Sequence, residues 1–266
     1  MVTVFDIIKL TLKNNCGQCG EPTCMSFATK VVTRGLDIRG CPYIKEIPAE
    51  LAEKTEGGGP RDNDPETALL KELREKIRGI DLSRIAADLG AGLKTSNKGA
   101  EVVLELPFFD DVVYVSKDEL TSAKDIELDP RDQILIYNYC FFGGRGPVSG
   151  QWVGLESFPN SVSKVSTLKR YTEDKLSEEF SSNIEALTER VTAIGGQLVE
   201  PCSADLCFEI QVFPKLILRF HFWGEEPEEG FSARAKVLYD RRAIEFLDLE
   251  SLVFAAERAV EKIIHQ

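Results

Sequence analysis

The chain has 266 residues, a formal net charge of −12 and seven cysteines, and 43% of its residues are hydrophobic. This composition suits a globular chain with a full core, and no apolar run reaches the roughly 20 residues that span a bilayer. The negative charge disfavours nucleic acid as a partner, because binding to phosphates relies on Lys and Arg. We therefore expect no nucleic acid and no membrane span. Because the N-terminus lacks a signal-peptide pattern, we also expect a cytoplasmic, reducing environment in which thiols stay free or bind metal.

Four cysteines stand close together early in the sequence: Cys16, Cys19 and Cys24 within C-G-Q-C-G-E-P-T-C, and Cys41 in a following C-P. Thiolates bind zinc, Cu(I) or iron–sulfur clusters. Zinc sites usually combine two C-x2-C hairpins, or one hairpin with histidines, and neither arrangement is present here. A tight loop of three cysteines with a remote Cys-Pro is typical of a cubane. The spacing thus favours an iron–sulfur cluster, with a zinc-bound module and a disulfide framework as the alternatives.

The residues after the loop predict a helix that has Cys24 in its first turn. Thr23 is the expected N-cap, after Pro22, and Gly35 is the expected end of the helix. The helix N-terminus would stabilise the negative charge of a thiolate. Its inward face is an apolar stripe formed by Cys24, Phe27, Ala28, Val31 and Val32. Loop glycines at 17 and 20 permit the sharp turn.

The segment N-N-C-G-Q-C-G-E-P-T-C-M-S-F-A-T-K, followed by G-x5-C-P at Gly35 to Pro42, resembles a known module. It is similar to the small [4Fe-4S] module that opens the large subunit of corrinoid iron–sulfur proteins, and to one in the B subunit of Rnf-type electron-transport complexes. The resemblance covers about residues 5–47 and implies one [4Fe-4S] cluster with four ligands: Cys16, Cys19, Cys24 and Cys41. The family often has a proline at the position of Thr11 or Leu12 and a threonine near Asn14, departures that leave the ligands untouched.

Residues 66–266 depart from those proteins. They resemble instead an uncharacterised domain of anaerobic bacteria and archaea that recurs behind this cluster module. Three stretches carry this resemblance: Gln151 to Pro159, Phe213 to Trp223, and Lys236 to Asp240. The resemblance implies no known activity.

We expect three parts: the cluster module at 1–47, a Gly- and Pro-rich linker at 48–65, and a larger domain at 66–266. Helices and strands occur in groups, which favours an α+β fold with antiparallel strands packed with helices. The expected helices are 66–78, 81–89, 130–141, 172–194 and 249–263. Asp81 and Asp129 are the expected N-caps of the second and third of these, and one face of the first is expected to carry Leu69, Leu70, Leu73 and Ile77. The expected strands are 101–106, 112–115, 151–158, 206–212, 216–223 and 235–239, and alternation indicates those at 101–106, 112–115, 206–212 and 216–223.

Charge is unevenly distributed between these parts. Residues 1–47 contain six Lys or Arg and four Asp or Glu, a charge of +2, which leaves −14 for residues 48–266. The basic residues of the module could offset the negative charge of a cluster or face an acidic partner, and a solvated mixed surface is an equally good explanation. They are Lys9, Lys13, Lys30, Arg34, Arg39 and Lys45.

Other patterns give weaker indications. The glycine-rich loop Gly143–Gly150 lacks the Lys-Ser/Thr of a phosphate loop, although Arg145 is a candidate for contacting an anion. Cys140, Cys202 and Cys207 are expected to fill the core rather than to form a second metal site. His221 is expected on a strand with a satisfied hydrogen bond. The acidic residues Asp205 and 225–229 are expected to form a solvated loop.

Three functions remain open at this point. We favour a one-electron carrier that serves a redox protein partner in anaerobic metabolism. Corrinoid or one-carbon metabolism is the branch we consider, with a corrinoid protein or methyltransferase system as the partner. The first alternative is an enzyme or accessory factor that holds a substrate or cofactor in residues 66–266. The second is a redox sensor or a structural cluster. No catalytic constellation is recognisable, so the sequence leans away from an enzyme.

Overall fold

The computed structural model describes residues 3–13, 16, 18–21, 23–34, 36–45, 47–48, 65–95 and 101–265. It divides into a smaller unit, Met1–Glu72, and a larger unit, Leu73–Gln266. The division falls inside helix α4 (Pro65–Arg78). Residues 49–64 of the expected linker, together with Gly17, Pro22 and Gly35, lie outside the described residues, so the expected boundaries stay a prediction.

Ahead of α4, the described residues of the smaller unit form two helices and a short 3-10 turn around one apolar cluster. They are α1 (Val4–Ile8), α2 (Cys24–Arg34) and η1 (Ile38–Gly40). Thr23 caps α2 as expected, because its Oγ1 accepts a hydrogen bond from the backbone N–H of Ser26 at 2.9 Å. Asp37 caps η1 in the same way, accepting from Arg39 N–H at 2.9 Å. These two caps fix where the chain enters α2 and where it returns to Cys41.

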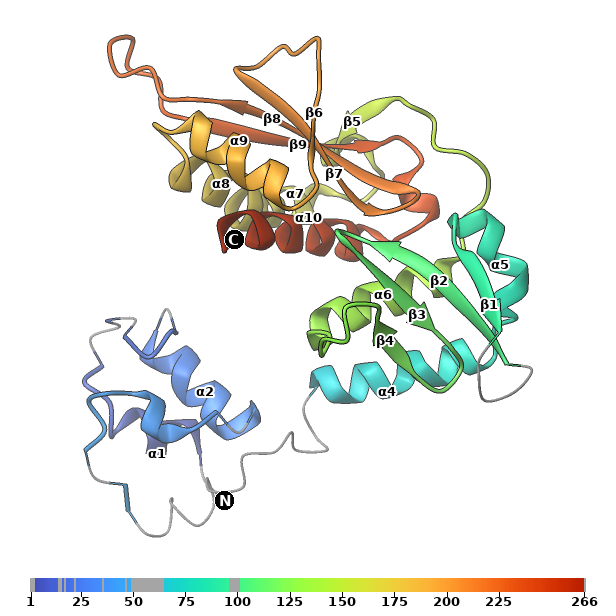
Figure 1. The fold of residues 1–266 in the computed structure, drawn as a ribbon. Helices are drawn as coiled ribbons and strands as arrows, with labels where there is room; N and C mark the ends of the chain where they lie inside the picture. The colour runs from blue at the N-terminus through green and yellow to red at the C-terminus, as the bar shows by residue number, and fades with distance from the viewer. Residues whose placement is uncertain are drawn as a thin grey trace. The chain divides into compact units, whose positions relative to one another are not determined.

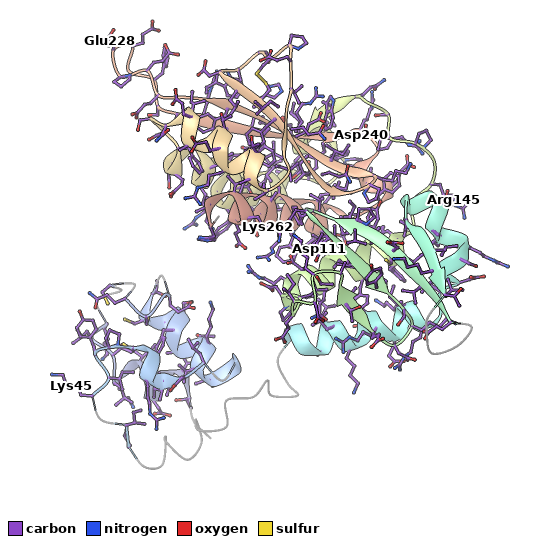
Figure 2. The ribbon with its side chains drawn as sticks, viewed as in Figure 1. Lys45, Asp111, Arg145, Glu228, Asp240 and Lys262 are labelled. Atoms are coloured by element: carbon purple, nitrogen blue, oxygen red, sulfur yellow. A yellow bond between two sulfur atoms is a disulfide. The ribbon has the colours of Figure 1, made fainter. Side chains whose placement is uncertain are left out.

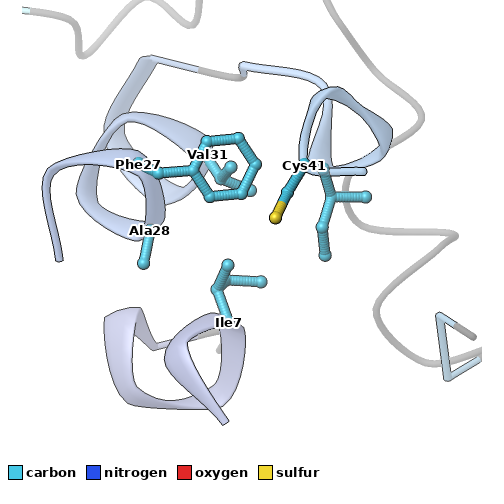
Figure 3. Close-up of a cluster of buried hydrophobic side chains, with 6 residues drawn as sticks. Ile7, Phe27, Ala28, Val31 and Cys41 are labelled. Atoms are coloured by element: carbon cyan, nitrogen blue, oxygen red, sulfur yellow. The ribbon is translucent and has the colours of Figure 1, made fainter. Parts of the chain in front are cut away.

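The apolar stripe of α2 supplies half of this cluster, and Figure 3 shows Cys41 pointing toward Phe27 and Ile7. Phe27, Ala28 and Val31 are buried, as predicted from their spacing. Cys24 and Val32 are only half-buried. The buried members of the cluster are Ile7, Phe27, Ala28, Val31, Ile38 and Cys41. So small a core gives little stability of its own.

The larger unit is built on two antiparallel sheets, which confirms the α+β class (Figure 1). In the described part of the chain, one sheet has the order β1-β2-β3-β4 and the other the order β5-β9-β8-β7-β6. The strands of the first are β1 (Gly92–Thr95), β2 (Val102–Phe108), β3 (Asp111–Val115) and β4 (Leu120–Ser122). Those of the second are β5 (Trp152–Gly154), β6 (Gln197–Leu198), β7 (Leu206–Phe213), β8 (Leu216–Trp223) and β9 (Arg234–Asp240).

Helices cover one side of each sheet, and their starts follow predicted caps. Asp81 caps α5 and Asp129 caps α6, which has Pro130 at its first position. Beside the first sheet lie α4, α5 (Leu82–Leu89) and α6 (Pro130–Phe142). Figure 1 shows the other helices along one face of the five-stranded sheet: α7 (Val162–Leu168), α8 (Asp174–Glu179), α9 (Ile184–Ala193) and α10 (Leu249–Ile264).

A buried tyrosine links α6 and α5 to the five-stranded sheet of the larger unit. The ring of Tyr139, from α6, stacks on Phe213 of β7 with centroids 4.1 Å apart. Its hydroxyl donates to the carbonyl of Leu89 at 2.9 Å and accepts from Lys215 N–H at 3.2 Å. Burial raises the pKa of this phenol well above its ordinary value, so it stays protonated and keeps both bonds. Tyr139 therefore fixes α5 and α6 against the second sheet, while Phe108 of β2 contacts Phe213 of β7 directly, with ring centroids 5.1 Å apart.

Two expected elements of the larger unit were wrong. The expected helix 172–194 begins earlier, at Val162, passes through a π-helical turn at Lys169–Glu173, and is interrupted between α8 and α9. The interruption is stabilised by Asn183, which caps α9, and by the carbonyl of Ser181, which accepts from Glu225 N–H at 2.9 Å. The expected strand 151–158 ends at Gly154 and continues as the 3-10 turn Leu155–Ser157. Local periodicity did not reveal either change of geometry.

Helix α4 buries only part of the face that was expected to point inward. In α4, Leu73 and Ile77 are buried as expected, but Leu69, also expected on the inward face, is exposed. Among the helices of the described residues, none combines the length and the apolar character needed to cross a bilayer.

Candidate functional site

All four cysteines of the N-terminal motif line one cavity of the smaller unit. Cys16 and Cys19 come from the loop before α2, Cys24 is the first residue of α2, and Cys41 follows η1. The other lining residues are Thr11, Leu12, Glu21, Phe27 and Tyr43. The structure thus brings together the four residues that the sequence singled out, including the remote one.

Burial increases from one side of this cavity to the other. Cys16 is exposed, Cys19 and Cys24 are half-buried, and Cys41 is 6% exposed and belongs to the apolar cluster of Figure 3. The position of Cys41 is set by core packing, whereas that of Cys16 is set only by the loop. One edge of a group bound here would therefore face solvent while the opposite edge would contact the core.

A carboxylate also lines the cavity, and its partners include an ammonium and a hydroxyl on α2. Glu21 Oε1 lies 2.6 Å from Lys30 Nζ, and Glu21 Oε2 accepts from Ser26 Oγ at 2.8 Å. Glu21 is buried, so an unpaired charge at this position would be costly. Lys30, expected to offset a cluster or face a partner, instead compensates this neighbouring carboxylate. The sequence analysis did not single out Glu21, although its position between Cys19 and Cys24 is a usable signal.

The donor chemistry of the cavity fits an iron–sulfur cluster, because four thiols converge and no histidine is among the lining residues. Its volume, about 10 Å³, has room for about one water molecule. Across the described residues, no three His, Cys, Asp or Glu side chains are grouped as a site that could hold a metal ion. A cluster would therefore require the four cysteine side chains to rearrange around it. The exposed Cys16 side can move outward more easily than the buried Cys41.

The larger unit contains a second hollow, a cleft of about 580 Å³. It lies where the β2–β3 hairpin, the start of α6 and the end of α10 meet, and Figure 2 labels Asp111 and Lys262 at its walls. The guanidinium of Arg258 donates to both oxygens of Asp132, at 2.8 and 3.0 Å. Lys262 Nζ lies 5.0 Å from the ring centroid of Phe109. The sequence analysis named none of these residues as a site, because they are distant in sequence and follow no motif.

The glycine-rich loop at 143–150 is held by packing and by two side chains. A Cβ on Gly144 would come within 2.1 Å of the Phe246 ring, which explains the glycine without a ligand. Arg242 donates to the carbonyls of Arg145 and Pro147, both at 2.7 Å. The side chain of Arg145 lies at the surface (Figure 2). The loop's structure is thus accounted for by Phe246 and Arg242.

Of the three remaining cysteines, one is a buried free thiol and two form a disulfide. Cys140 is fully buried in α6, as expected, and burial raises the pKa of its thiol to about 12. The expectation that Cys202 and Cys207 fill the core as free thiols was wrong, because they form a disulfide. Strand β7 fixes Cys207, and the loop before it brings Cys202 to a Cα–Cα distance of 5.5 Å, which suits a disulfide.

His221 and the acidic residues behave largely as expected. His221 is half-buried on β8, with Nδ1 3.4 Å from Ser203 Oγ. Burial, and then the charge of Arg219, lower the pKa of this imidazole, so it is neutral at neutral pH. The residues 225–229 form an exposed loop, in which Figure 2 labels Glu228.

The helices and sheets of the larger unit correspond to a known family. Residues 81–262, more than half of the chain, match the family described as "Domain of unknown function (DUF3786)". The chain belongs to this family. Residues 13–43, ahead of the DUF3786 domain, match the family described as "Putative Fe-S cluster". This match supports an iron–sulfur cofactor in the smaller unit.

Curated relatives match part of this chain. The acetyl-CoA decarbonylase/synthase complex subunit gamma of Methanocaldococcus jannaschii is 44% identical over 53 residues, 20% of this chain and 11% of that protein. The corrinoid/iron-sulfur protein large subunit of Moorella thermoacetica is 35% identical over 52 residues, 20% of this chain and 12% of that protein. Subunit gamma 1 of Methanosarcina thermophila is 33% identical over 103 residues, 36% of this chain and 17% of that protein.

These relatives confirm the resemblance to corrinoid iron–sulfur large subunits, but the alignments span between about a tenth and a fifth of each relative's length. No solved structure matches the chain.

Proposed function

We propose that the chain binds one [4Fe-4S] cluster through Cys16, Cys19, Cys24 and Cys41 and passes single electrons to a protein partner. The observation that carries the proposal is the meeting of these four cysteines at one cavity. The matched iron–sulfur family over residues 13–43 supports the same reading. When bound, a cluster of this type supplies a reversible one-electron couple.

The side chains around the cavity divide into an anchoring side and a contact side. Cys41, packed against Phe27, anchors one corner of the site and keeps water from it. On the other side, Cys16 is exposed, and Leu12, which also lines the cavity, is 55% exposed. An exposed apolar residue beside an exposed ligand is a suitable contact for a transient redox partner, whose interface is small. We propose that the partner docks on this side.

The partner and pathway are proposed from the names of the relatives. They are subunits of an acetyl-CoA decarbonylase/synthase complex and of a corrinoid/iron-sulfur protein. We therefore propose a cytoplasmic protein of anaerobic one-carbon metabolism whose partner is a corrinoid protein or a methyltransferase system.

Anaerobic reconstitution followed by iron and sulfide analysis tests the cluster. We expect four iron and four sulfide per chain, and an electron paramagnetic resonance signal after reduction with dithionite. Cys41→Ala should abolish this signal, whereas Cys140→Ala, which removes a buried thiol from the larger unit, should retain it. Stoichiometric zinc without sulfide would refute the cluster. A cluster that cannot be reduced would refute electron transfer and favour a structural role.

A second candidate is an accessory factor that holds a small ligand in the larger unit. The observation in its favour is the cleft of the larger unit, which is lined by both cationic and carboxylate side chains, including Lys262 and Asp111, and whose volume lies in the range of ligand pockets. Thermal shift of Lys262→Ala against the unaltered chain, measured with sets of anionic and cationic metabolites, tests this candidate. A ligand that stabilises only the unaltered chain would support it, and the absence of any shift would leave the carrier as the better account.

A further inference from the structure

We propose that Cys202 and Cys207 form a dithiol–disulfide redox site of the larger unit, which exchanges two electrons with thiols of a substrate. The site is independent of the cysteine cavity in the smaller unit. None of the matched families or relatives assigns it.

The pair is asymmetric in its access to solvent. Cys202 is half-buried between the exposed residues Pro201 and Ser203, whereas Cys207 is 3% exposed within β7. A thiolate attacks one sulfur of a disulfide along the axis of the S–S bond, so it reacts at the sulfur that it can reach. The structure thus assigns Cys202 as the sulfur that meets the substrate and Cys207 as the sulfur that leaves and later returns.

Hydrogen bonds, in addition to the disulfide, hold the fold around the pair. Backbone hydrogen bonds run from Val199 N–H to the Cys207 carbonyl at 2.9 Å and from Asp205 N–H to the Phe222 carbonyl at 3.0 Å. The carboxylate of Asp205 also accepts from Gly224 N–H at 2.9 Å. The disulfide closes a loop with a sequence separation of 5, and short loops gain little stability from a crosslink. Opening it therefore leaves the surrounding strands paired, as a redox site requires.

The surroundings of the pair are polar on the accessible side. Cys207 stands directly opposite His221 in the β7–β8 register, so their side chains are cross-strand neighbours on one face of the sheet. Ser203, next to Cys202, approaches the same imidazole. The neutral imidazole can accept a hydrogen bond from a thiol of the reduced pair. Cys140, by contrast, is enclosed in the core and has no such access.

The proposed reaction balances with one dithiol substrate. A substrate thiolate attacks Cys202 Sγ, the Cys202–Cys207 bond breaks, and Cys207 leaves as a thiolate and takes up a proton. The second substrate thiol then loses its proton and attacks the mixed disulfide, which releases Cys202 as a thiolate that is protonated in turn. The substrate is oxidised to a disulfide by two electrons, and the pair is reduced to two thiols. Two molecules of a monothiol give the same balance.

The redox state of the pair can be read directly, because one tryptic peptide, residues 191–215, contains both cysteines. The full chain is equilibrated anaerobically in buffers with different ratios of reduced to oxidised dithiothreitol, quenched in acid, alkylated and digested. We expect the peptide to change from unlabelled to doubly labelled over one two-electron transition in the folded protein. A peptide that becomes labelled only after unfolding in urea would show a structural disulfide and overturn the proposal. A peptide that is doubly labelled in every buffer would overturn it as well.

Single variants test the order of attack. Cys207→Ser, mixed with oxidised glutathione or with a single-cysteine thioredoxin activated by a thionitrobenzoate leaving group, should accumulate a mixed disulfide at Cys202. Cys202→Ser should accumulate at least tenfold less, because Cys207 is buried. Accumulation with glutathione alone would indicate small thiols as the substrate class, and accumulation with thioredoxin would indicate a protein dithiol. Equal trapping by the two variants would overturn the assignment.

Discussion

Glu21 and Lys30 form an ion pair at the edge of the cysteine cavity, with Oε1 and Nζ 2.6 Å apart. The carboxylate is buried, and the ammonium is the partner that compensates it on the helix that begins at Cys24. The charge next to the proposed cluster is therefore set by two residues that are not ligands. Because a cluster gains a negative charge on reduction, its potential depends on whether this pair is intact.

Lys30→Gln should lower the reduction potential of the bound cluster. The variant leaves the charge of Glu21 without its compensating ammonium, which makes an added electron less favourable. A unit charge near a protein surface changes such an energy by about 1 kcal/mol, or about 40 mV for one electron. Redox titration followed by electron paramagnetic resonance measures the shift.

Glu21→Gln provides the matched control, because it removes the opposite charge and should raise the potential. The double variant should return close to the unaltered value. If both single variants shift the potential in the same direction, the effect comes from altered packing and not from charge.

Phe27→Ala should release the cluster although Phe27 is not a ligand. Its ring is buried against Cys41, and removing it leaves a cavity that costs about 3–5 kcal/mol in a typical core. The smaller unit has too few buried residues to absorb such a loss, so retention of the cluster should fail first. Loss of visible absorbance over time, compared with Met25→Ala at an exposed position of the same helix, measures it. Equal retention in the two variants would contradict the coupling of core and site.

A fragment that begins at Pro65 should fold without iron. It retains all of α4, whose Leu73 and Ile77 are buried, together with both sheets of the larger unit. A fragment that begins at Ile80 loses both side chains, each worth about 2–5 kcal/mol in a core, and should melt earlier or fail to fold. Cooperative melting followed by circular dichroism compares the two. Failure of the longer fragment would show that the two units depend on each other.

The sequence predicted those parts of the structure that short-range chemistry decides. The caps at Thr23, Asp81 and Asp129 were predicted because a side chain next to a helix start satisfies free N–H groups locally. The buried stripe of α2 followed from helical periodicity, and the strands β7 and β8 from alternation. The convergence of four cysteines was predicted from their spacing and from the resemblance together.

Features that depend on distant residues were missed or mistaken. The interruption before α9 depends on Glu225, which is far away in sequence and bonds to Ser181. The disulfide required knowing that the loop after residue 199 folds back beside β7, which the spacing of Cys202 and Cys207 permits but does not require. Strand β1 was missed because it is short and exposed, so it carries no alternation. Tertiary contacts, and not local pattern, decided each of these.

Asp240 should stabilise the larger unit in a manner that depends on pH. Burial raises the pKa of this carboxyl, but N–H donors from Ser149, Arg242 and Gly150 outweigh burial and lower it below its ordinary 3.8. A group with a lowered folded-state pKa stabilises the fold fully above its unfolded pKa, and that stability is lost as the pH falls through the folded pKa. The advantage of the unaltered chain over Asp240→Asn should thus be constant above about pH 5 and decline below about pH 3.8. Urea unfolding at several pH values checks this, and an advantage that grows as the pH falls would contradict it.

Arg258→Ala should destabilise the larger unit much more than Arg131→Ala. The side chain of Arg258 is 9% exposed and donates to both oxygens of Asp132, which is 7% exposed. Removing one partner leaves a buried carboxylate without its counter-charge, which typically costs about 3–5 kcal/mol in free energy of unfolding.

Arg131 pairs with Asp129 and Glu261 at the rim of the same cleft, but its side chain is 40% exposed. Exposed pairs are worth about 0–1 kcal/mol, so Arg131→Ala is the matched control. Urea denaturation of the unaltered chain and the two variants should give Arg258→Ala a free energy of unfolding several kcal/mol lower than the other two. Near-equal midpoints would show that water reaches Asp132 and that the pair is not buried in solution.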